Sequence, residues 1–176
     1  SSEDCGSGWG SLAPARPLCV LRRSGYTFGM SLLFRDVAGP CLAPGVSIVC
    51  VGAFDGVHLG HRALLARVRE RADALGLVAL AISFEPIPRE FFARGAAVPR
   101  LATAREKIEY LAEAGMSRVL MLRFDAALAA MSAQAFVEEV LIQRAGVREI
   151  MVGADFRFGH ARRGDVALLR ASGERF

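Results

Sequence analysis

Two histidines of the sequence stand in a short glycine-rich stretch. His58 and His61 are separated by two residues, and Gly52, Gly56 and Gly60 surround them. Glycine lets the backbone approach a ligand closely, and the amide groups and the dipole at a helix N-terminus attract anions. Imidazoles in this place can donate hydrogen bonds to phosphate oxygens. The pattern therefore predicts phosphate chemistry, in which fixed donors stabilise the charge that develops when a nucleotide α-phosphate is attacked, without a protein nucleophile.

Other residues could take part in the same chemistry. Arg157 stands between Phe156 and Phe158, and a guanidinium suits both phosphate groups and aromatic faces. The two phenylalanines either belong to the core or line a ligand pocket. Asp55 precedes a glycine, so it is either a turn residue or a polar, Mg²⁺-linked contact near the phosphates. We expect Arg162 to be a solvated surface charge.

Alternating strands and helices must position these residues. Continuous apolar runs predict buried strands, and leucines and alanines at helical spacing predict helices, one of which ends at Gly76 and another of which starts with a Thr103/Glu106 capping box. We expect strands at residues 47–54, 77–84, 118–124 and 147–155, and helices at 61–75, 103–114 and 132–145 and from Asp165 onward. This order predicts an α/β fold, a doubly wound, Rossmann-like parallel sheet with helices on both faces.

A parallel sheet of this kind brings distant segments together. Ligands bind beyond the carboxyl ends of the strands, where the strand order reverses. This rule places residues 54–61, 84–88 and 155–165 on one rim of the sheet. All three histidines of the sequence, His58, His61 and His160, fall on that rim.

The same segments resemble a known family. His58-Leu59-Gly60-His61 matches the His-x-Gly-His pattern of the nucleotidyltransferase superfamily, and residues 52–61 resemble the opening motif of the adenylyltransferase domain of bacterial bifunctional riboflavin kinase/FAD synthetases. Similar motifs follow in the same order: Phe84-Glu85-Pro86-Ile87-Pro88, Arg105-Glu106-Lys107, residues 119–124 before Asp125, and residues 152–159 with Arg163-Gly164-Asp165. The likeness covers about residues 30–176. Ile87 stands where many members of the family have histidine.

The resemblance implies an activity and a site. It implies transfer of AMP from ATP to FMN, with Mg²⁺ accompanying ATP, FMN as substrate and FAD as product. His58 and His61 would be the catalytic residues. The implied ATP-binding residues are Gly52, Phe54, Asp55, Gly56, His58, Gly60 and His61, and the implied flavin and nucleotide pocket comprises Phe84, Pro86, Asp155, Phe156, Arg157, Phe158, Arg163 and Asp165.

The two ends of the sequence qualify this expectation. Residues 1–29 lack the period of a helix or strand and are expected to be a leader or extension, which leaves residues 30–176 as the adenylyltransferase domain. Phe176 precedes the Ser-Ser-Thr-x-x-Arg type motif of such domains and their riboflavin kinase domain, so we expect the chain to be weak or inactive alone. Two alternatives stay open: a non-catalytic nucleotide- or flavin-binding fragment, and another small-molecule adenylyl- or cytidylyltransferase.

Composition limits the protein class. The 176 residues are 53% hydrophobic and 23% charged, which is typical of a folded globular domain. The net charge of +4 fits a nucleotide partner or an ordinary basic surface. The four cysteines lack metal-site or disulfide spacing, so we expect free thiols, with Cys41 and Cys50 as small buried hydrophobes, and a cytoplasmic location. We expect ATP and FMN as partners, and neither nucleic acid nor a membrane; no pattern indicates the oligomeric state.

Overall fold

A five-stranded parallel sheet forms the centre of the molecule. The computed structural model describes residues 32–43, 46–93 and 96–175, so the expected leader and two of the cysteines, Cys5 and Cys19, lie outside the described residues. The strands are β1 (Leu32–Arg35), β2 (Ser47–Val51), β3 (Val78–Glu85), β4 (Arg118–Arg123) and β5 (Val147–Met151). They stand in the order β1-β4-β3-β2-β5. Strands β2, β3 and β4 are thus successive neighbours, and β5 lies on the other side of β2. The strand order therefore reverses between β2 and β5, and we call this place the reversal point.

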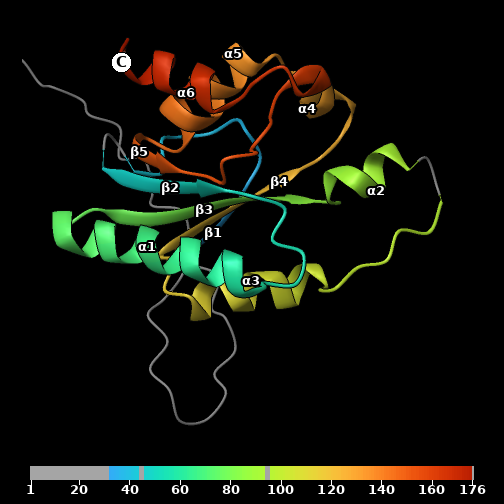
Figure 1. The fold of residues 1–176 in the computed structure, drawn as a ribbon, viewed down its shortest axis with the longest axis horizontal. Coiled ribbons are helices and arrows are strands. Elements are labelled where there is room, and N and C mark those ends of the chain that lie inside the picture. Colours follow the sequence, from blue (N-terminus) through green and yellow to red (C-terminus); the bar gives the residue numbers. More distant parts are fainter. Residues whose placement is uncertain (1–31, 44–45, 94–95, 176) are drawn as a thin grey trace, which may run out of the picture.

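Helices cover both faces of this sheet (Figure 1). On one face lie α1 (Leu59–Leu75) and α3 (Ala104–Glu113); on the other lie α4 (Ala126–Ala130), α5 (Ala133–Ala135), the π-helix η1 (Phe136–Arg144) and α6 (Val166–Gly173). Two short pieces complete the fold, α2 (Pro88–Phe92) after β3 and a 3-10 turn, η2 (His160–Arg162). The doubly wound α/β class is confirmed.

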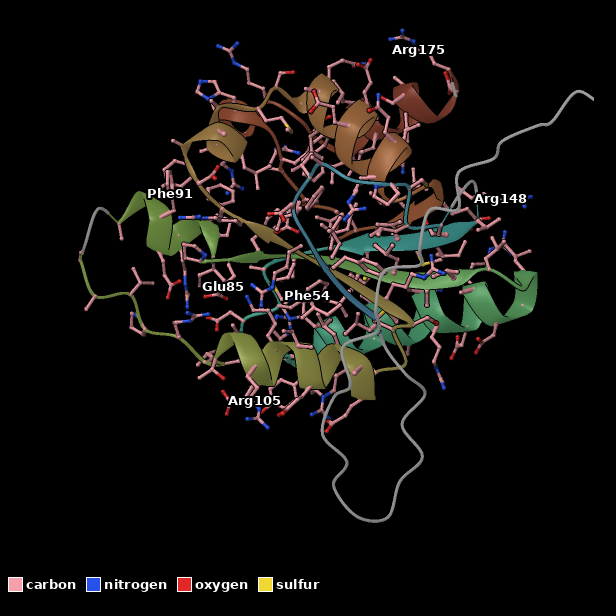
Figure 2. The ribbon with its side chains drawn as sticks, turned by 180° about the vertical axis from the view of Figure 1, so that it is seen from behind. Phe54, Glu85, Phe91, Arg105, Arg148 and Arg175 are labelled. Atoms are coloured by element: carbon pink, nitrogen blue, oxygen red, sulfur yellow. The ribbon has the colours of Figure 1, made fainter. Side chains whose placement is uncertain are left out.

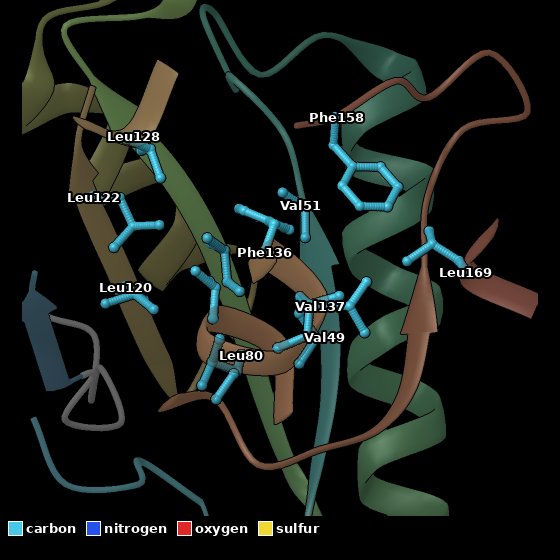
Figure 3. Packing of buried hydrophobic residues seen from close by; sticks show 14 of the residues in the cluster. Val49, Val51, Leu80, Leu120, Leu122, Leu128, Phe136, Val137, Phe158 and Leu169 are labelled. Atoms are coloured by element: carbon cyan, nitrogen blue, oxygen red, sulfur yellow. The ribbon is translucent and has the colours of Figure 1, made fainter. Parts of the chain in front are cut away.

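The alternation of side chains along β2 divides the core into two layers. Ile48 and Cys50 pack toward α1 and α3, and Val49 and Val51 pack toward η1, because successive side chains of a strand point to opposite faces. Figure 3 shows the second layer, in which valines of β2 meet Leu80, Leu120 and Phe136. All five residues of β2 are buried, as expected for a central parallel strand.

The main elements appear where the sequence predicts them, with shorter strands. β2 stops at Val51 instead of residue 54, since Phe54 has a φ of 47° and has left the strand. β5 stops at Met151 instead of residue 155. The helix expected at residues 132–145 exists, but after one turn it continues as a π-helix. A shift from α- to π-hydrogen bonding leaves no mark on the hydrophobic period.

Several short elements were not predicted. β1, α2, α4 and η2 have three to five residues each, too few to show a period. Pro86 and Pro88 were expected only to end the strand, yet Pro88 begins α2, the position where a fixed φ and a missing N–H suit a helix. Cys50 is a buried thiol whose pKa burial raises to about 12, whereas Cys41 is only half-buried; both are free. No helix among the described residues has the length and apolarity to span a membrane.

Candidate functional site

His58 is both the cap of α1 and a side chain open to solvent. Its backbone is extended, with φ −72° and ψ 173°, and its Nδ1 accepts a hydrogen bond from the His61 backbone N–H at 3.3 Å. Because Nδ1 is the acceptor, the neutral ring carries its proton on Nε2. The exposed His58 ring therefore presents an N–H donor beside the N-terminus of α1.

His61 lies beneath this ring. The two imidazoles stack with centroids 3.7 Å apart and planes inclined by 21°, and the edge of Phe54 supports His61 from below at 5.1 Å. Burial, followed by the neighbouring charge of His58, lowers the pKa of His61; a hydrogen bond with the Gly56 backbone partly opposes this. Its Nδ1 is buried and has no hydrogen-bond partner among the described residues. A buried polar atom without a partner is rare in folded proteins, so this nitrogen is an unusual feature of the helix start.

The first turn of α1 adds further donors. Its early backbone N–H groups have no acceptor within the helix, and the turn contains no acidic residue. The N–H groups and the helix dipole therefore favour an anion beside His58.

Glycines make room for this arrangement. A Cβ on Gly52 would lie 3.1 Å from the Phe54 ring, and one on Gly60 would lie 3.3 Å from the His58 ring. At Gly56, φ is +61° and a Cβ would come within 2.6 Å of Leu101. These glycines thus make space for neighbouring side chains of the protein. From the sequence, they were expected only to make space for a ligand.

The Asp55 carboxylate is occupied by protein groups. Oδ1 accepts the backbone N–H groups of Leu101 at 2.9 Å and Ala102 at 3.1 Å, and Oδ2 accepts a hydrogen bond from Arg89. The Asp55 side chain is only 10% exposed. Arg89 also donates to the Pro99 carbonyl. Asp55 therefore joins the loop after β2 to α2 and to the residues before α3.

A second charged group surrounds the end of β3. Arg100 binds Glu85 through two hydrogen bonds of 2.8 Å and reaches Glu90 at 3.3 Å. Lys107 is fully buried and donates to the Phe84 carbonyl at 2.9 Å. Burial lowers the pKa of Lys107 and Glu85 opposes the shift, while the hydrogen bond to Glu85 raises the pKa of Arg100. These contacts hold the end of β3 firmly against α3.

An aromatic cluster lies at the same end of the sheet. Phe124 follows β4 and lies edge-on to three rings, with centroids 5.8 Å from Phe84, 5.4 Å from Phe91 and 5.8 Å from Phe92. Phe92 is 62% exposed. Figure 2 shows Phe91 at this end, Glu85 and then Phe54 further toward the middle, and Arg148 on the opposite side of the molecule. The cluster offers an apolar, partly open aromatic surface.

The segment after β5 begins beside the loop after β2, because β2 and β5 are paired neighbours. Phe158 and Gly164 form a backbone bridge, with hydrogen bonds of 2.9 and 3.1 Å, that closes this segment into a compact loop. Asp165 caps α6 by accepting the Leu168 N–H at 2.9 Å, and Arg157 reaches Asp165 at 3.9 Å. Asp155 is exposed.

The family follows from comparison with known proteins. A family model described as FAD synthetase matches residues 43–176. The chain belongs to the FAD synthetase family. It is 45% identical over 126 residues to the bifunctional riboflavin kinase/FMN adenylyltransferase of Escherichia coli strain K12, a match that covers 72% of this chain and 40% of the relative.

Two further relatives bear the same name. The Pseudomonas fluorescens protein is 46% identical over 126 residues, covering 72% of this chain and 40% of the relative. The Haemophilus influenzae protein is 40% identical over 126 residues, covering 72% and 41%. This chain thus spans about 40% of the length of these relatives. A solved structure titled macrolide-efflux protein, from Streptococcus pneumoniae, has a TM-score of 0.65 at 21% identity and covers 79% of this chain and 46% of its own; it shows the fold alone.

The structure sorts the site residues expected for a FAD synthetase-family chain. The glycine-rich loop, His58 and His61 come together at the carboxyl end of β2, and Phe84 and Pro86 stand at the end of β3. Two of these residues are buried at the side chain. The Phe54 ring is fully buried and packs against His61; Phe158 is 7% exposed and belongs to the core, with Phe156 stacked on it at 5.5 Å.

The remaining expected residues have less defined surroundings. The Arg163 side chain makes no hydrogen bond or ion pair within the part of the chain that the structure describes, and Arg162 is exposed as expected. His160 contacts the Ala129 carbonyl through Nδ1 at 3.2 Å and the Met131 carbonyl through its backbone N–H at 2.7 Å, rather than the other two histidines. Sequence reasoning missed Phe91, Phe92 and Phe124; the Phe-Phe pair after two prolines was the available signal.

Proposed function

We propose that this chain transfers AMP from ATP to FMN, which gives FAD and pyrophosphate. The observation that carries the proposal is the stacked pair of His58 and His61 at the N-terminus of α1, beside the reversal point of the sheet, in a member of the FAD synthetase family. The similarity to proteins named bifunctional riboflavin kinase/FMN adenylyltransferase supports it.

The ATP phosphates would lie over the first turn of α1. There the Nε2–H of His58 and the early N–H groups of the helix donate to phosphate oxygens, and charge that builds on the α-phosphate and the leaving pyrophosphate meets donors that are already fixed. The terminal phosphate of FMN is the nucleophile and is already anionic near neutral pH, so no general base is needed. The protein contributes alignment and charge stabilisation.

Mg²⁺ would be held mainly by ATP. No three His, Cys, Asp or Glu side chains of the described residues gather into a cluster fit for a metal ion, and Asp55 has both oxygens engaged. This suits Mg²⁺, which keeps several waters and binds through substrate phosphates with one or two carboxylates. Asp155, exposed after β5, is a carboxylate of the proposed rim that could contribute to holding it. Bound there, the ion would neutralise phosphate charge.

The aromatic cluster is the proposed place for the flavin ring. Phe84, Phe91 and Phe124 are half-buried and Phe92 is exposed. A flat flavin ring can therefore pack against these aromatic rings, two of which belong to α2. We extend the pocket to the residues expected after β5, Asp155, Arg157, Arg163 and Asp165. A reaction between ATP and FMN fits the cytoplasm, where free thiols also persist.

The test is formation of FAD from ATP, Mg²⁺ and FMN, followed by chromatography and fluorescence, with the 176-residue chain and with any longer product that its gene encodes. His58→Asn is the decisive variant, since asparagine also caps helices but lacks the Nε2 donor. We expect a rate loss of about a hundredfold to a thousandfold at an unchanged melting temperature. His61→Phe, which keeps a ring between His58 and Phe54, serves as the second variant.

The outcomes separate the alternatives. Turnover of ATP with another phosphate acceptor, and none with FMN, would show a different adenylyltransferase. Binding of ATP and FMN without FAD from any version of the protein would show a non-catalytic binding module. FAD formation by His58→Asn at the parent rate would refute the role of the histidine pair.

A further inference from the structure

Asp55 is the feature that the phosphate chemistry leaves unexplained. It stands three residues before His58, in the loop that is proposed to bind ATP, yet its oxygens accept three hydrogen bonds from the protein. The bonded groups lie 34 to 47 residues further along the chain. A carboxylate that is satisfied in this way and only 10% exposed has little capacity left for a metal or a phosphate-bound water.

These bonds connect the ATP loop to α2. Arg89 belongs to α2, donates to Asp55 and also holds the Pro99 carbonyl. On the other side of Asp55, Leu101 and Ala102 lead directly into α3, and Leu101 packs over Gly56 so closely that a Cβ there would clash. The loop after β2 is thus pinned from two directions.

The same short helix also builds the aromatic cluster. Phe91 and Phe92 of α2 lie 5.4 and 5.8 Å from Phe124, and no residue of α2 itself is fully buried. Besides the buried Ile87 at its start and the Glu90–Arg100 ion pair, α2 is held by two lateral contacts, the rings on Phe124 and the Arg89 guanidinium on Asp55. A change at either contact is transmitted to the other through a helix of only five residues.

We propose that Asp55 is a positioning residue that couples the flavin pocket to the ATP loop, and that it is not a metal ligand. The proposal rests on the proposed function. A flavin ring bound on the aromatic cluster fixes α2, Arg89 then holds Asp55, and the loop that carries His58 is set for the phosphates. By linkage, FMN tightens the binding of ATP, and ATP tightens the binding of FMN by the same factor.

The experiment is a double-mutant cycle on binding. Asp55→Asn keeps an acceptor for the Leu101 and Ala102 N–H groups and removes the charge opposite Arg89; Arg89→Met removes the guanidinium alone. Arg71→Met breaks a comparable pair, Arg71 with Glu149 at 2.7 Å, which joins α1 to β5, and is the control. The dissociation constant of α,β-methylene-ATP is measured by calorimetry with and without FMN, together with the Mg²⁺ concentration that half-saturates FAD synthesis.

We expect FMN to tighten the analogue at least about fivefold in the parent and in Arg71→Met. This coupling factor should fall to twofold or less in Asp55→Asn and in Arg89→Met, and no further in the double variant. The Mg²⁺ requirement should be unchanged in all of them. If Asp55→Asn does not fold, Arg89→Met carries the test, because its side chain is 53% exposed.

Three results would overturn the inference alone: FAD synthesis with an unaltered coupling factor in both variants, a higher Mg²⁺ requirement in Asp55→Asn but not in Arg89→Met, or a parent that makes FAD without any coupling. A parent that binds neither ligand would overturn the proposed function together with the inference.

Discussion

His58 serves the helix and the candidate ligand with the two nitrogens of one ring. Nδ1 satisfies a backbone donor of α1, and this contact leaves the Nε2 proton for a phosphate. His61 cannot do the same, since its Nδ1 is enclosed and its ring is held between His58 and Phe54. The two imidazoles therefore have different roles: the His58 ring faces the ligand, and the His61 ring fixes the orientation of the His58 ring.

The first prediction concerns the pH dependence of His61. Its pKa in the folded protein lies below the unfolded value of about 6.5. Below about pH 6.5 the unfolded chain takes up a proton at His61 that the folded chain resists. The contribution of His61 to the free energy of unfolding is therefore fully present above about pH 6.5 and is lost as the pH falls below it. Urea unfolding across this range should show the loss, and His61→Phe should show a smaller one. Equal slopes for the two proteins would contradict the prediction.

A second measurement identifies the neighbour. The imidazole resonances of His61 should titrate below the usual range in the parent, and the pKa should rise in His58→Asn, because the neighbouring charge is then absent.

At the residue scale, the sequence predicts local motifs better than it predicts contacts between distant residues. The histidine pair, its glycines and the capping box of Thr103 and Glu106 could be read from local spacing, and the structure shows the capping box. The partners of Asp55 could not, since they lie 34 to 47 residues away and two of them are backbone groups that any residue would provide. The burial of Phe54 likewise depends on side chains of α1 and α3.

Among the elements, predictability depends on length. α1 and α3 have 17 and 10 residues and clear periods, whereas α2 and α4 have five residues each and were missed. The consequence for the site is direct, because α2 carries both Arg89 and half of the aromatic cluster. The candidate ATP loop and Phe84 were therefore predictable from the sequence, whereas the rings that α2 and Phe124 add to the aromatic cluster were not.

Two glycines at helix ends provide a matched prediction. Gly76 and Gly146 both have left-handed backbones, with φ of 65° and 62°. A Cβ on Gly76 meets nothing within 4 Å, while one on Gly146 would lie 1.8 Å from the Ala43 carbonyl oxygen. Gly76→Ala should therefore lower the free energy of unfolding by about 1–2 kcal/mol, and Gly146→Ala by about 1–3 kcal/mol more. Denaturant unfolding of the two variants measures the difference; equal losses would show that the turn before β5 can yield.

For the whole molecule, the order of the strands explains why one rim collects the site. β2, β3 and β4 are sequential neighbours, and the return to β5 places the segment after Met151 beside the loop after Val51. Ends of three strands thus contribute side chains from residues 52–61, 84–92 and 124, and the fifth strand adds residues 152–165. The parallel fold was predictable from alternation alone, because a covered parallel sheet admits few arrangements.

This division of the rim predicts two separable ligand effects on stability. A ligand that binds only the folded chain, at a hundred times its dissociation constant, adds about 2.7 kcal/mol, and in a chain of this size this raises the melting temperature by roughly 5–11 °C. His58→Asn should lose the shift produced by ATP and keep most of the shift produced by FMN, whereas Phe124→Ala should do the reverse. Thermal unfolding of the parent and both variants, with each ligand alone, provides the comparison. If both variants lost both shifts equally, the phosphate loop and the aromatic cluster would form one indivisible site, and the assignment of the flavin ring to Phe124 would fail.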